Sequence, residues 1–125
     1  MRRCLNMLIV STKNTLYSSH QLKNHKGKCG RLHGHQYEVL LKLKAEYEVI
    51  KNDDCNFLID FYDLDKKWEK LFPSDHININ EITNEDNPSV EFLSKWIYDN
   101  LKKEIPELYS VKIYETPTNA CEYYE

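Results

Sequence analysis

Residues 29–45 read CGRLHGHQYEVLLKLKA, and this stretch decides how the chain folds. From Tyr37 onward, apolar residues take every second position and charged residues fill most positions between them, the pattern of a strand with one buried face. Extended backward, the same alternation places His33 and His35 on the buried face with Tyr37. Two histidines at positions i and i+2 of a strand can reach one metal ion, and Gly34 leaves room between them. A polar turn that enters a strand explains this short run equally well.

A third histidine, His20, and the cysteine Cys29 strengthen the metal interpretation. Three imidazoles without an obvious fourth protein ligand are typical of catalytic zinc, which keeps one position open for water or substrate. The predicted ligands are therefore His20, His33 and His35, and the predicted ion is Zn²⁺. Cys29, four residues before His33, is a candidate base, nucleophile or further ligand.

The composition is that of an ordinary globular chain. Its 125 residues are 41% hydrophobic and 30% charged, which predicts a single domain over residues 1–125 with its own core. No apolar run approaches the ~20 residues of a membrane span, and residues 1–6 are expected to be a short tail rather than a signal peptide. We therefore expect a cytoplasmic protein that does not contact a membrane. The four cysteines form no CxxC pair, so free thiols are expected.

Charge is distributed unevenly along the chain. The net charge is −3, but residues 1–37 hold seven Lys and Arg and no acid, whereas residues 38–125 hold twenty acids and ten bases. The basic loop ahead of His33 would attract a small anionic ligand, although a solvated lysine-rich loop has the same composition. The acidic remainder argues against a nucleic-acid partner.

The other elements follow from periodicity and from residues that end helices. Strands are expected over residues 7–20, 33–50, 111–115 and 120–125. Helices are expected over residues 61–72, where Pro73 ends the apolar stripe, and from Pro88, with Asn87 as its N-cap, to Pro106. Loops are expected over residues 21–32, 51–56 and 73–87. The order ββααββ is that of an α+β fold, an antiparallel sheet with two helices on one face.

Two further sites carry groups that could take part in chemistry. Asp75 beside His76 could orient that imidazole for proton transfer, although such a pair in a loop can equally be a cap or a surface pair. Glu115 ends a strand on the register of Val111 and Ile113, which places its carboxylate on the face that bears the core. There it either binds a ligand or lies in water at the sheet edge.

Taken in order, these motifs resemble the 6-pyruvoyltetrahydropterin synthase superfamily. They are His20, Cys29-xxx-His33-Gly34-His35, Ile59-Asp60-Phe61, Asp75-His76, residues 87–91 (NPSVE) and Glu115-Thr116. The match covers residues 7–125. The three-residue gap between Cys29 and His33, with Lys28 ahead, is most similar to the 6-carboxy-5,6,7,8-tetrahydropterin synthases of queuosine biosynthesis. The pyruvoyl-forming members usually have a longer gap.

The resemblance implies the tunnelling fold (T-fold), in which subunits join edge to edge into a barrel. It also implies a homohexamer with active sites at subunit interfaces. The implied activity is that of a zinc-dependent lyase that converts 7,8-dihydroneopterin triphosphate to 6-carboxy-5,6,7,8-tetrahydropterin, acetaldehyde and triphosphate. Two alternatives remain open: a pyruvoyl-type or side-chain-cleaving enzyme on the same site, and a zinc-stabilised pterin-binding module without turnover.

The resemblance also implies roles for single residues. The zinc ligands would be His20, His33 and His35. The acid/base groups would be Cys29 and His76, the latter oriented by Asp75. The substrate-binding residues would be Glu115 at the pterin ring, Thr116 beside it and Lys28 near the triphosphate. The chain departs from the family at Tyr17-Ser18-Ser19, Asn56, Ser74 and Ser89, and none of these changes removes a proposed chemical group.

Overall fold

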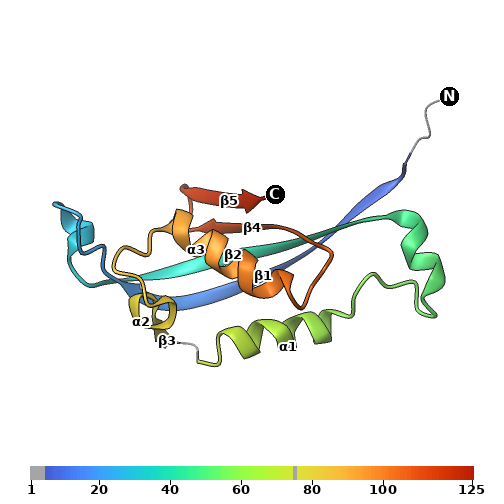
Figure 1. Cartoon of the computed structure of the whole chain (residues 1–125), viewed down its shortest axis with the longest axis horizontal. Coiled ribbons are helices and arrows are strands. Elements are labelled where there is room, and N and C mark those ends of the chain that lie inside the picture. The colour runs from blue at the N-terminus through green and yellow to red at the C-terminus, as the bar shows by residue number, and fades with distance from the viewer. Residues whose placement is uncertain (1–4, 75) are drawn as a thin grey trace.

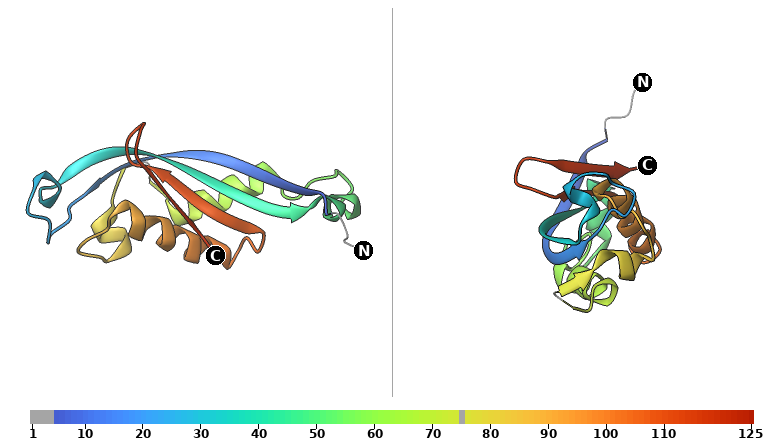
Figure 2. Two further views of the ribbon diagram at one scale, coloured as in Figure 1. Left: turned by 90° about the horizontal axis from the view of Figure 1, so that it is seen from above. Right: turned by 90° about the vertical axis from the view of Figure 1, so that its left-hand side faces the viewer.

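A curved five-stranded sheet carries its helices on one face in the computed structural model, which describes residues 5–74 and 76–125 (Figure 1, Figure 2). The strands are β1 (Met7–His20), β2 (His33–Glu46), β3 (His76–Asn78), β4 (Leu108–Tyr114) and β5 (Ala120–Tyr124). They lie in the order β3-β1-β2-β4-β5. Cys4 and Asp75 lie outside the described residues.

A long hairpin of β1 and β2 forms the centre of the sheet. The two strands pair along their whole length, from Met7 opposite Glu46 to His20 opposite His33. Residues that lie opposite one another share a face, so the even positions of β1 and the odd positions of β2 line the helix-covered face. Tyr37 and Leu41 on that face are completely buried. The alternation predicted from the sequence is confirmed.

The helices are α1 (Phe61–Leu71), α2 (Ile79–Thr83) and α3 (Val90–Lys102), with short 3-10 helices η1 (Lys28–Gly30) and η2 (Tyr47–Asn52). The apolar stripes of α1 and α3 bury Leu64 and Ile97 in the common core. Asn56 adopts φ 57°, a left-handed conformation that asparagine tolerates.

Helix α3 begins later than the sequence suggested. Its N-cap is Ser89, whose hydroxyl oxygen accepts a hydrogen bond from the backbone N–H of Phe92 at 3.2 Å. The prediction of Asn87 as N-cap and Pro88 as the first helical residue is therefore wrong. The reason is that the Ser89 hydroxyl caps the helix, so Pro88 stays outside it and its carbonyl oxygen is available to another group.

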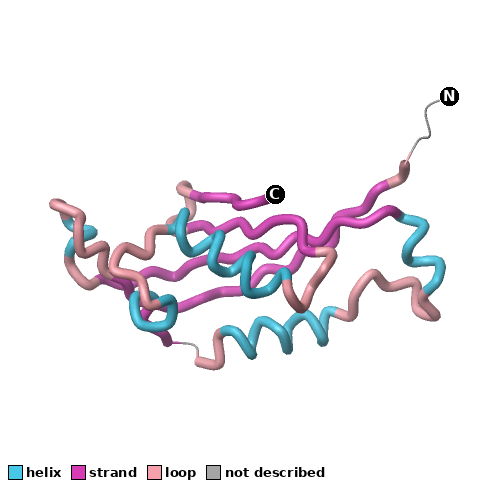
Figure 3. Tube along the Cα trace, in the orientation of Figure 1, coloured by secondary structure: helices cyan, strands magenta, loops and turns pink. Residues whose placement is uncertain are grey.

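Two other segments differ from the predicted elements, as the tube in Figure 3 shows. The second strand ends at Glu46 rather than at residue 50, because residues 47–52 turn into η2. The expected loop over residues 73–87 contains β3 and α2. Because β3 pairs in parallel with β1, with Tyr17 opposite His76, the sheet is mixed rather than wholly antiparallel. Within the described residues, no helix is both long and apolar enough for a bilayer crossing.

Candidate functional site

Three histidines meet where the β1–β2 hairpin opens into the loop of residues 21–32. His20 ends β1 directly opposite His33, which begins β2. His35 lies two residues further along β2, on the same face. The ring centroids of His20, His33 and His35 are 4.5–5.0 Å apart. The structure thus brings together the three histidines that the sequence singled out.

Backbone carbonyl groups fix the orientation of two of these rings. The Nδ1 atom of His20 lies 3.0 Å from the carbonyl oxygen of Pro88, and that of His33 lies 2.7 Å from the carbonyl oxygen of Arg31. A carbonyl oxygen only accepts, so each Nδ1 carries the hydrogen and each Nε2 presents a lone pair. The two Nε2 atoms face each other at 2.9 Å.

His35 completes the group together with Glu115. Glu115 follows β4, and its Oε1 atom lies 3.1 Å from His35 Nε2. The contact lacks hydrogen-bond geometry, so His35 Nε2 is a buried nitrogen with no hydrogen-bond partner among the described residues. The sequence predicted that the Glu115 carboxylate lies on the face that bears the core, and its contact with His35 on that face confirms the prediction.

This cluster has the donor set and the spacing of a metal centre. One ligand atom each from His20, His33, His35 and Glu115 lies within 4.8 Å of the others. Two nitrogens at 2.0–2.1 Å from a tetrahedral ion would be about 3.3 Å apart. Facing lone pairs and a buried nitrogen without a partner are what a bound cation would satisfy. The residues therefore fit a metal ion.

Burial keeps the cluster in the state that metal binding needs. The His20 side chain is almost fully buried, at 1% exposure. Desolvation is the largest cause that lowers the pKa of His20 and of His35, so the neutral imidazole is favoured. Burial also raises the pKa of Tyr37 far above its usual value. Its hydroxyl stays protonated and lies 3.2 Å from His20 Nδ1 and 3.3 Å from His20 Nε2.

Cys29 lies in η1, in the loop that joins the two liganding strands. Its side chain is half-buried, and its sulfur is not one of the ligand atoms that gather within 4.8 Å. The following residue, Gly30, is required by packing: a Cβ atom there would lie 2.3 Å from the backbone oxygen of His25. Gly34 is not required in this way, since a Cβ there would make an ordinary 3.5 Å contact with Ser18.

His76 is not one of the residues whose ligand atoms gather in the cluster. It pairs opposite Tyr17, and the two rings stack with centroids 6.0 Å apart. Tyr17 belongs to the odd positions of β1, so His76 shares the face away from the helices. A hollow of about 410 Å³ beside them is also bordered by His35. Among the described residues, no hydrogen bond joins His76 to the three histidines.

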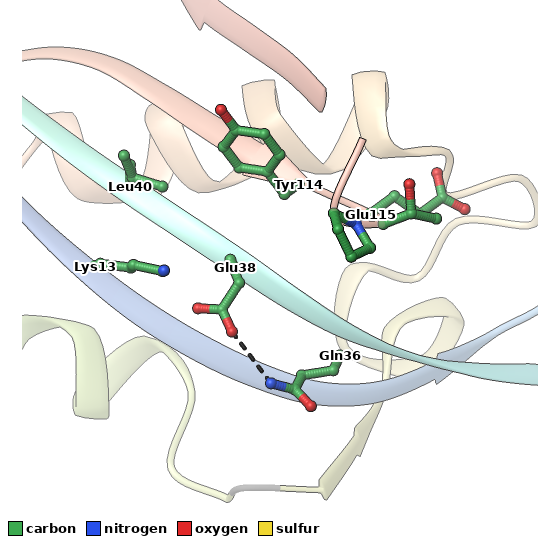
Figure 4. Close-up of a pocket in the computed structure, with 8 residues that line it drawn as sticks. Lys13, Gln36, Glu38, Leu40, Tyr114 and Glu115 are labelled. Atoms are coloured by element: carbon green, nitrogen blue, oxygen red, sulfur yellow. Dashed lines mark hydrogen bonds between the residues drawn. The ribbon is translucent and has the colours of Figure 1, made fainter. Parts of the chain in front are cut away.

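A second hollow, of about 780 Å³, lies on the same outer face, beside the end of β4 (Figure 4). Its lining residues are Lys13, Gln36, Glu38, Leu40, Tyr114, Glu115, Thr116 and Pro117. Ligand pockets commonly have about this volume. Glu115 borders this pocket and also contacts His35, so it connects the pocket to the histidine cluster.

The remaining predicted site residues are placed as follows. Thr116 begins the β4–β5 turn, and its hydroxyl oxygen accepts hydrogen bonds from the backbone N–H groups of Thr118 and Asn119. Lys28 is exposed in η1. Sequence reasoning missed the contact of Tyr37 with His20, although Tyr37 shared the predicted face. It could not find the carbonyls of Pro88 and Arg31, because a backbone oxygen has no signature in the side-chain pattern.

Comparisons with known proteins show the family of the chain. The family model described as 6-pyruvoyl tetrahydropterin synthase matches residues 9–125. A protein of Synechocystis sp. named 6-carboxy-5,6,7,8-tetrahydropterin synthase is 29% identical over 121 residues, or 94% of each chain. Human 6-pyruvoyl tetrahydrobiopterin synthase is 32% identical over 110 residues, which cover 78% of this chain and 70% of the human one.

A solved structure confirms the tunnelling fold. Caenorhabditis elegans 6-pyruvoyl tetrahydropterin synthase superimposes with a TM-score of 0.81 at 24% identity, over 100% of this chain and 99% of that one. A second structure, from Plasmodium falciparum, gives a TM-score of 0.65 at 18% identity. At these identities the likeness concerns the fold alone.

Proposed function

The chain belongs to the 6-pyruvoyl tetrahydropterin synthase family, and we propose that it is a zinc-dependent lyase that forms 6-carboxy-5,6,7,8-tetrahydropterin from 7,8-dihydroneopterin triphosphate. Acetaldehyde and triphosphate would be the other products. The observation that carries this proposal is the convergence of His20, His33 and His35, with two Nε2 lone pairs turned inward by backbone carbonyls.

Zinc suits this donor set better than a harder cation does. Three imidazole nitrogens are typical ligands of catalytic zinc, whereas magnesium and calcium prefer oxygen. When bound, zinc would supply a Lewis acid for the side-chain oxygens of the substrate. Two of the three imidazoles, those of His20 and His33, are held in orientation without substrate, since the carbonyl oxygens of Pro88 and Arg31 bind their Nδ1 atoms.

The residues around the metal cluster would supply proton transfer and substrate recognition. Cys29 lies outside the ligand cluster, in the loop between the liganding strands, which suits a general base rather than a ligand. Glu115 borders the 780 Å³ pocket and would accept hydrogen bonds from the amino and ring N–H groups of the pterin. Thr116 would shape that end of the pocket through the turn, and Lys28 would face the triphosphate.

A second copy of the chain would complete the active site. His76 is needed as the other acid/base, yet it lies on the sheet face away from the histidine cluster of its own chain. Its partner would therefore be the cluster of a neighbouring subunit, as in a homohexamer with active sites at subunit interfaces. Among the described residues, no strand pairs with the outer edge of β1 over residues 7–16, since β3 pairs with residues 17–19. An open strand edge can pair with another chain.

The 6-carboxy product is favoured over the 6-pyruvoyl product by the short gap between Cys29 and His33 and by the Synechocystis relative. The human relative makes the pyruvoyl-type reaction the second candidate. A 6-carboxypterin would serve queuosine biosynthesis. Mass spectrometry of the products from 7,8-dihydroneopterin triphosphate separates the possibilities. We expect the 6-carboxy mass together with acetaldehyde; a 6-pyruvoyl mass would select the second candidate, and unchanged substrate would leave a binding module.

A further inference from the structure

Asn80, at the start of α2, ties the end of β1 to the turn that precedes α3. Its Oδ1 atom accepts a hydrogen bond from the backbone N–H of Gln21 at 2.7 Å, and its Nδ2 atom donates to the backbone oxygen of Gln21 at 2.7 Å. The same Nδ2 donates to the backbone oxygens of Glu85 and Asp86, each at 3.2 Å. Both Nδ2 hydrogens are used, one of them shared between two carbonyl oxygens, so the side-chain amide joins two backbone segments.

Both of these backbone segments lie next to groups that position His20. Gln21 directly follows His20, so the clamp on its backbone fixes the point where the His20 side chain leaves β1. Glu85 and Asp86 directly precede the segment that presents the carbonyl oxygen of Pro88, which lies 3.0 Å from His20 Nδ1. Asn80 therefore holds the histidine and its hydrogen-bond acceptor at a fixed separation.

The clamp also reaches the loop that carries Cys29. The side-chain Nε2 of Gln21 donates to the backbone oxygen of Gly30 at 2.8 Å. One residue further on, the N–H of Leu22 donates to the carbonyl oxygen of Cys29 at 2.9 Å. Asn80 thus holds the backbone of Gln21, and residues 21–22 in turn hold the backbone of the loop that carries Cys29.

We infer that Asn80 is a positioning residue of the metal centre. It keeps the Nε2 atom of His20 turned toward the ion, and through Gln21 it fixes the position of the Cys29 loop relative to the ion. The inference rests on the proposed metal-binding function. Groups hydrogen-bonded to a metal ligand typically change metal affinity by 10–100-fold when they are removed. Asn80 acts through the backbone of the next residue, Gln21, so the low end of that range is expected.

Other links join the same segments: the backbone N–H of Lys23 donates to the backbone oxygen of Asp86 at 3.1 Å, and that of Asn24 donates to Asn87 Oδ1 at 2.9 Å. They remain in an Asn80 variant, but neither contacts Gln21. The exposed ion pair of Lys23 with Asp86 at 3.0 Å contributes little because solvent screens it.

The test compares Asn80→Ala with Asn78→Ala. Asn78 is the last residue of β3 and the N-cap of α2, where its Oδ1 accepts from the N–H of Glu81 at 3.3 Å. Its backbone pairs with Ser19 in the sheet, but among the described residues its side chain makes no hydrogen bond to Gln21. Zinc affinity is measured for both variants by competition with a chromogenic chelator. We expect Asn80→Ala to bind zinc at least about tenfold more weakly than the parent protein, and Asn78→Ala to bind as the parent does.

Two further readouts use the metal-free protein and report on position directly. The ¹⁵N signals of the His20 ring show which nitrogen carries the hydrogen, and amide exchange reports the Gln21 hydrogen bond. Asn80→Ala should mix the two His20 tautomers and speed exchange at Gln21. If Asn80→Ala does not fold, Asn80→Asp serves instead. The aspartate keeps an oxygen that accepts from the N–H of Gln21, but its second oxygen replaces the NH₂ group and repels the three backbone oxygens that this group bonded.

The outcomes are distinct. Parental zinc affinity together with an unchanged His20 tautomer in the Asn80 variant would overturn the inference. Equal weakening in Asn78→Ala would also overturn it, because the effect would then belong to the stability of α2. If the parent protein binds no zinc, the proposed function fails, and the His20 tautomer and Gln21 exchange alone decide whether Asn80 positions the histidine.

Discussion

The Nε2 atoms of His20 and His33 lie 2.9 Å apart at the open end of the β1–β2 hairpin, and the other nitrogen of each ring is held by a backbone carbonyl. Two nitrogen lone pairs at this distance repel unless a proton or a metal ion lies between them. The fold therefore holds two imidazoles in the arrangement that a cation would need, which would lower the cost of ordering them on binding.

Replacing His33 with alanine should reduce the zinc content well below the one ion per chain expected for the parent protein, because one of three imidazole ligands is lost. Elemental analysis of the purified variants measures this directly. His25→Ala is the matched control, since His25 is an exposed histidine of the loop that precedes β2 and lies outside the cluster. Full zinc retention in His33→Ala would remove His33 from the site.

Replacing Glu115 with glutamine should weaken pterin binding about tenfold or more. The change removes a charge-assisted hydrogen bond worth roughly 1.5–3 kcal/mol and turns an NH₂ group toward the donors of the ring. Titration calorimetry with a stable pterin gives the affinity, with Glu81→Gln as an exposed control. Because Glu115 also lies 3.1 Å from His35, zinc content is measured in parallel. Loss of zinc would make Glu115 a metal ligand, and unchanged affinity would exclude it from recognition.

The metal-free protein should lose stability as the pH falls. Burial lowers the pKa of His20 and of His35 in the folded state, so the unfolded chain takes up protons first, near its ordinary pKa of about 6.5. The free energy of unfolding then decreases as the pH drops through about 6.5, a range in which most carboxylates stay ionised. Urea denaturation at about pH 7.5 and about pH 5.5 measures the difference, which should shrink in His20→Gln. Equal stability at the two pH values would contradict the burial of neutral imidazoles.

Mixed oligomers should recover activity that their separate parents lack. Cys29→Ala and His76→Ala proteins should each be inactive, while Cys29→Ala retains its zinc because the sulfur lies outside the cluster. If His76 serves the site of a neighbouring chain, random mixing leaves about a quarter of the sites with both groups intact. Activity of co-refolded mixtures is the measurement. A mixture as inactive as its parents would place both groups in one chain.

The sequence predicted those elements in which apolar residues recur at regular intervals. Alternation identified β1 and β2 and the shared face of His33, His35 and Tyr37. The family resemblance and the prediction of an enzyme are confirmed by the comparisons. The elements β3 and α2 were missed because three and five residues are too short to show a period.

Other features depend on tertiary pairing and leave no mark in the local pattern. Residues 47–50 continue the alternation of β2, with Tyr47 and Val49 in the apolar positions, but these side chains have no core to face and remain exposed. The face of His76 follows from the parallel pairing of β3 with β1. The carbonyl acceptors of Pro88 and Arg31 depend on where the backbone passes, which is also why the role inferred for Asn80 emerges only from the structure.

The most direct test of the account is the dependence of product formation on zinc. The protein is stripped with a chelator, restored with zinc, and supplied with 7,8-dihydroneopterin triphosphate at each stage, while 6-carboxy-5,6,7,8-tetrahydropterin is followed by mass spectrometry. We expect the product to form with the zinc-loaded protein, to disappear on stripping and to return when zinc is restored. Product formation at an undiminished rate by the stripped protein would contradict this prediction.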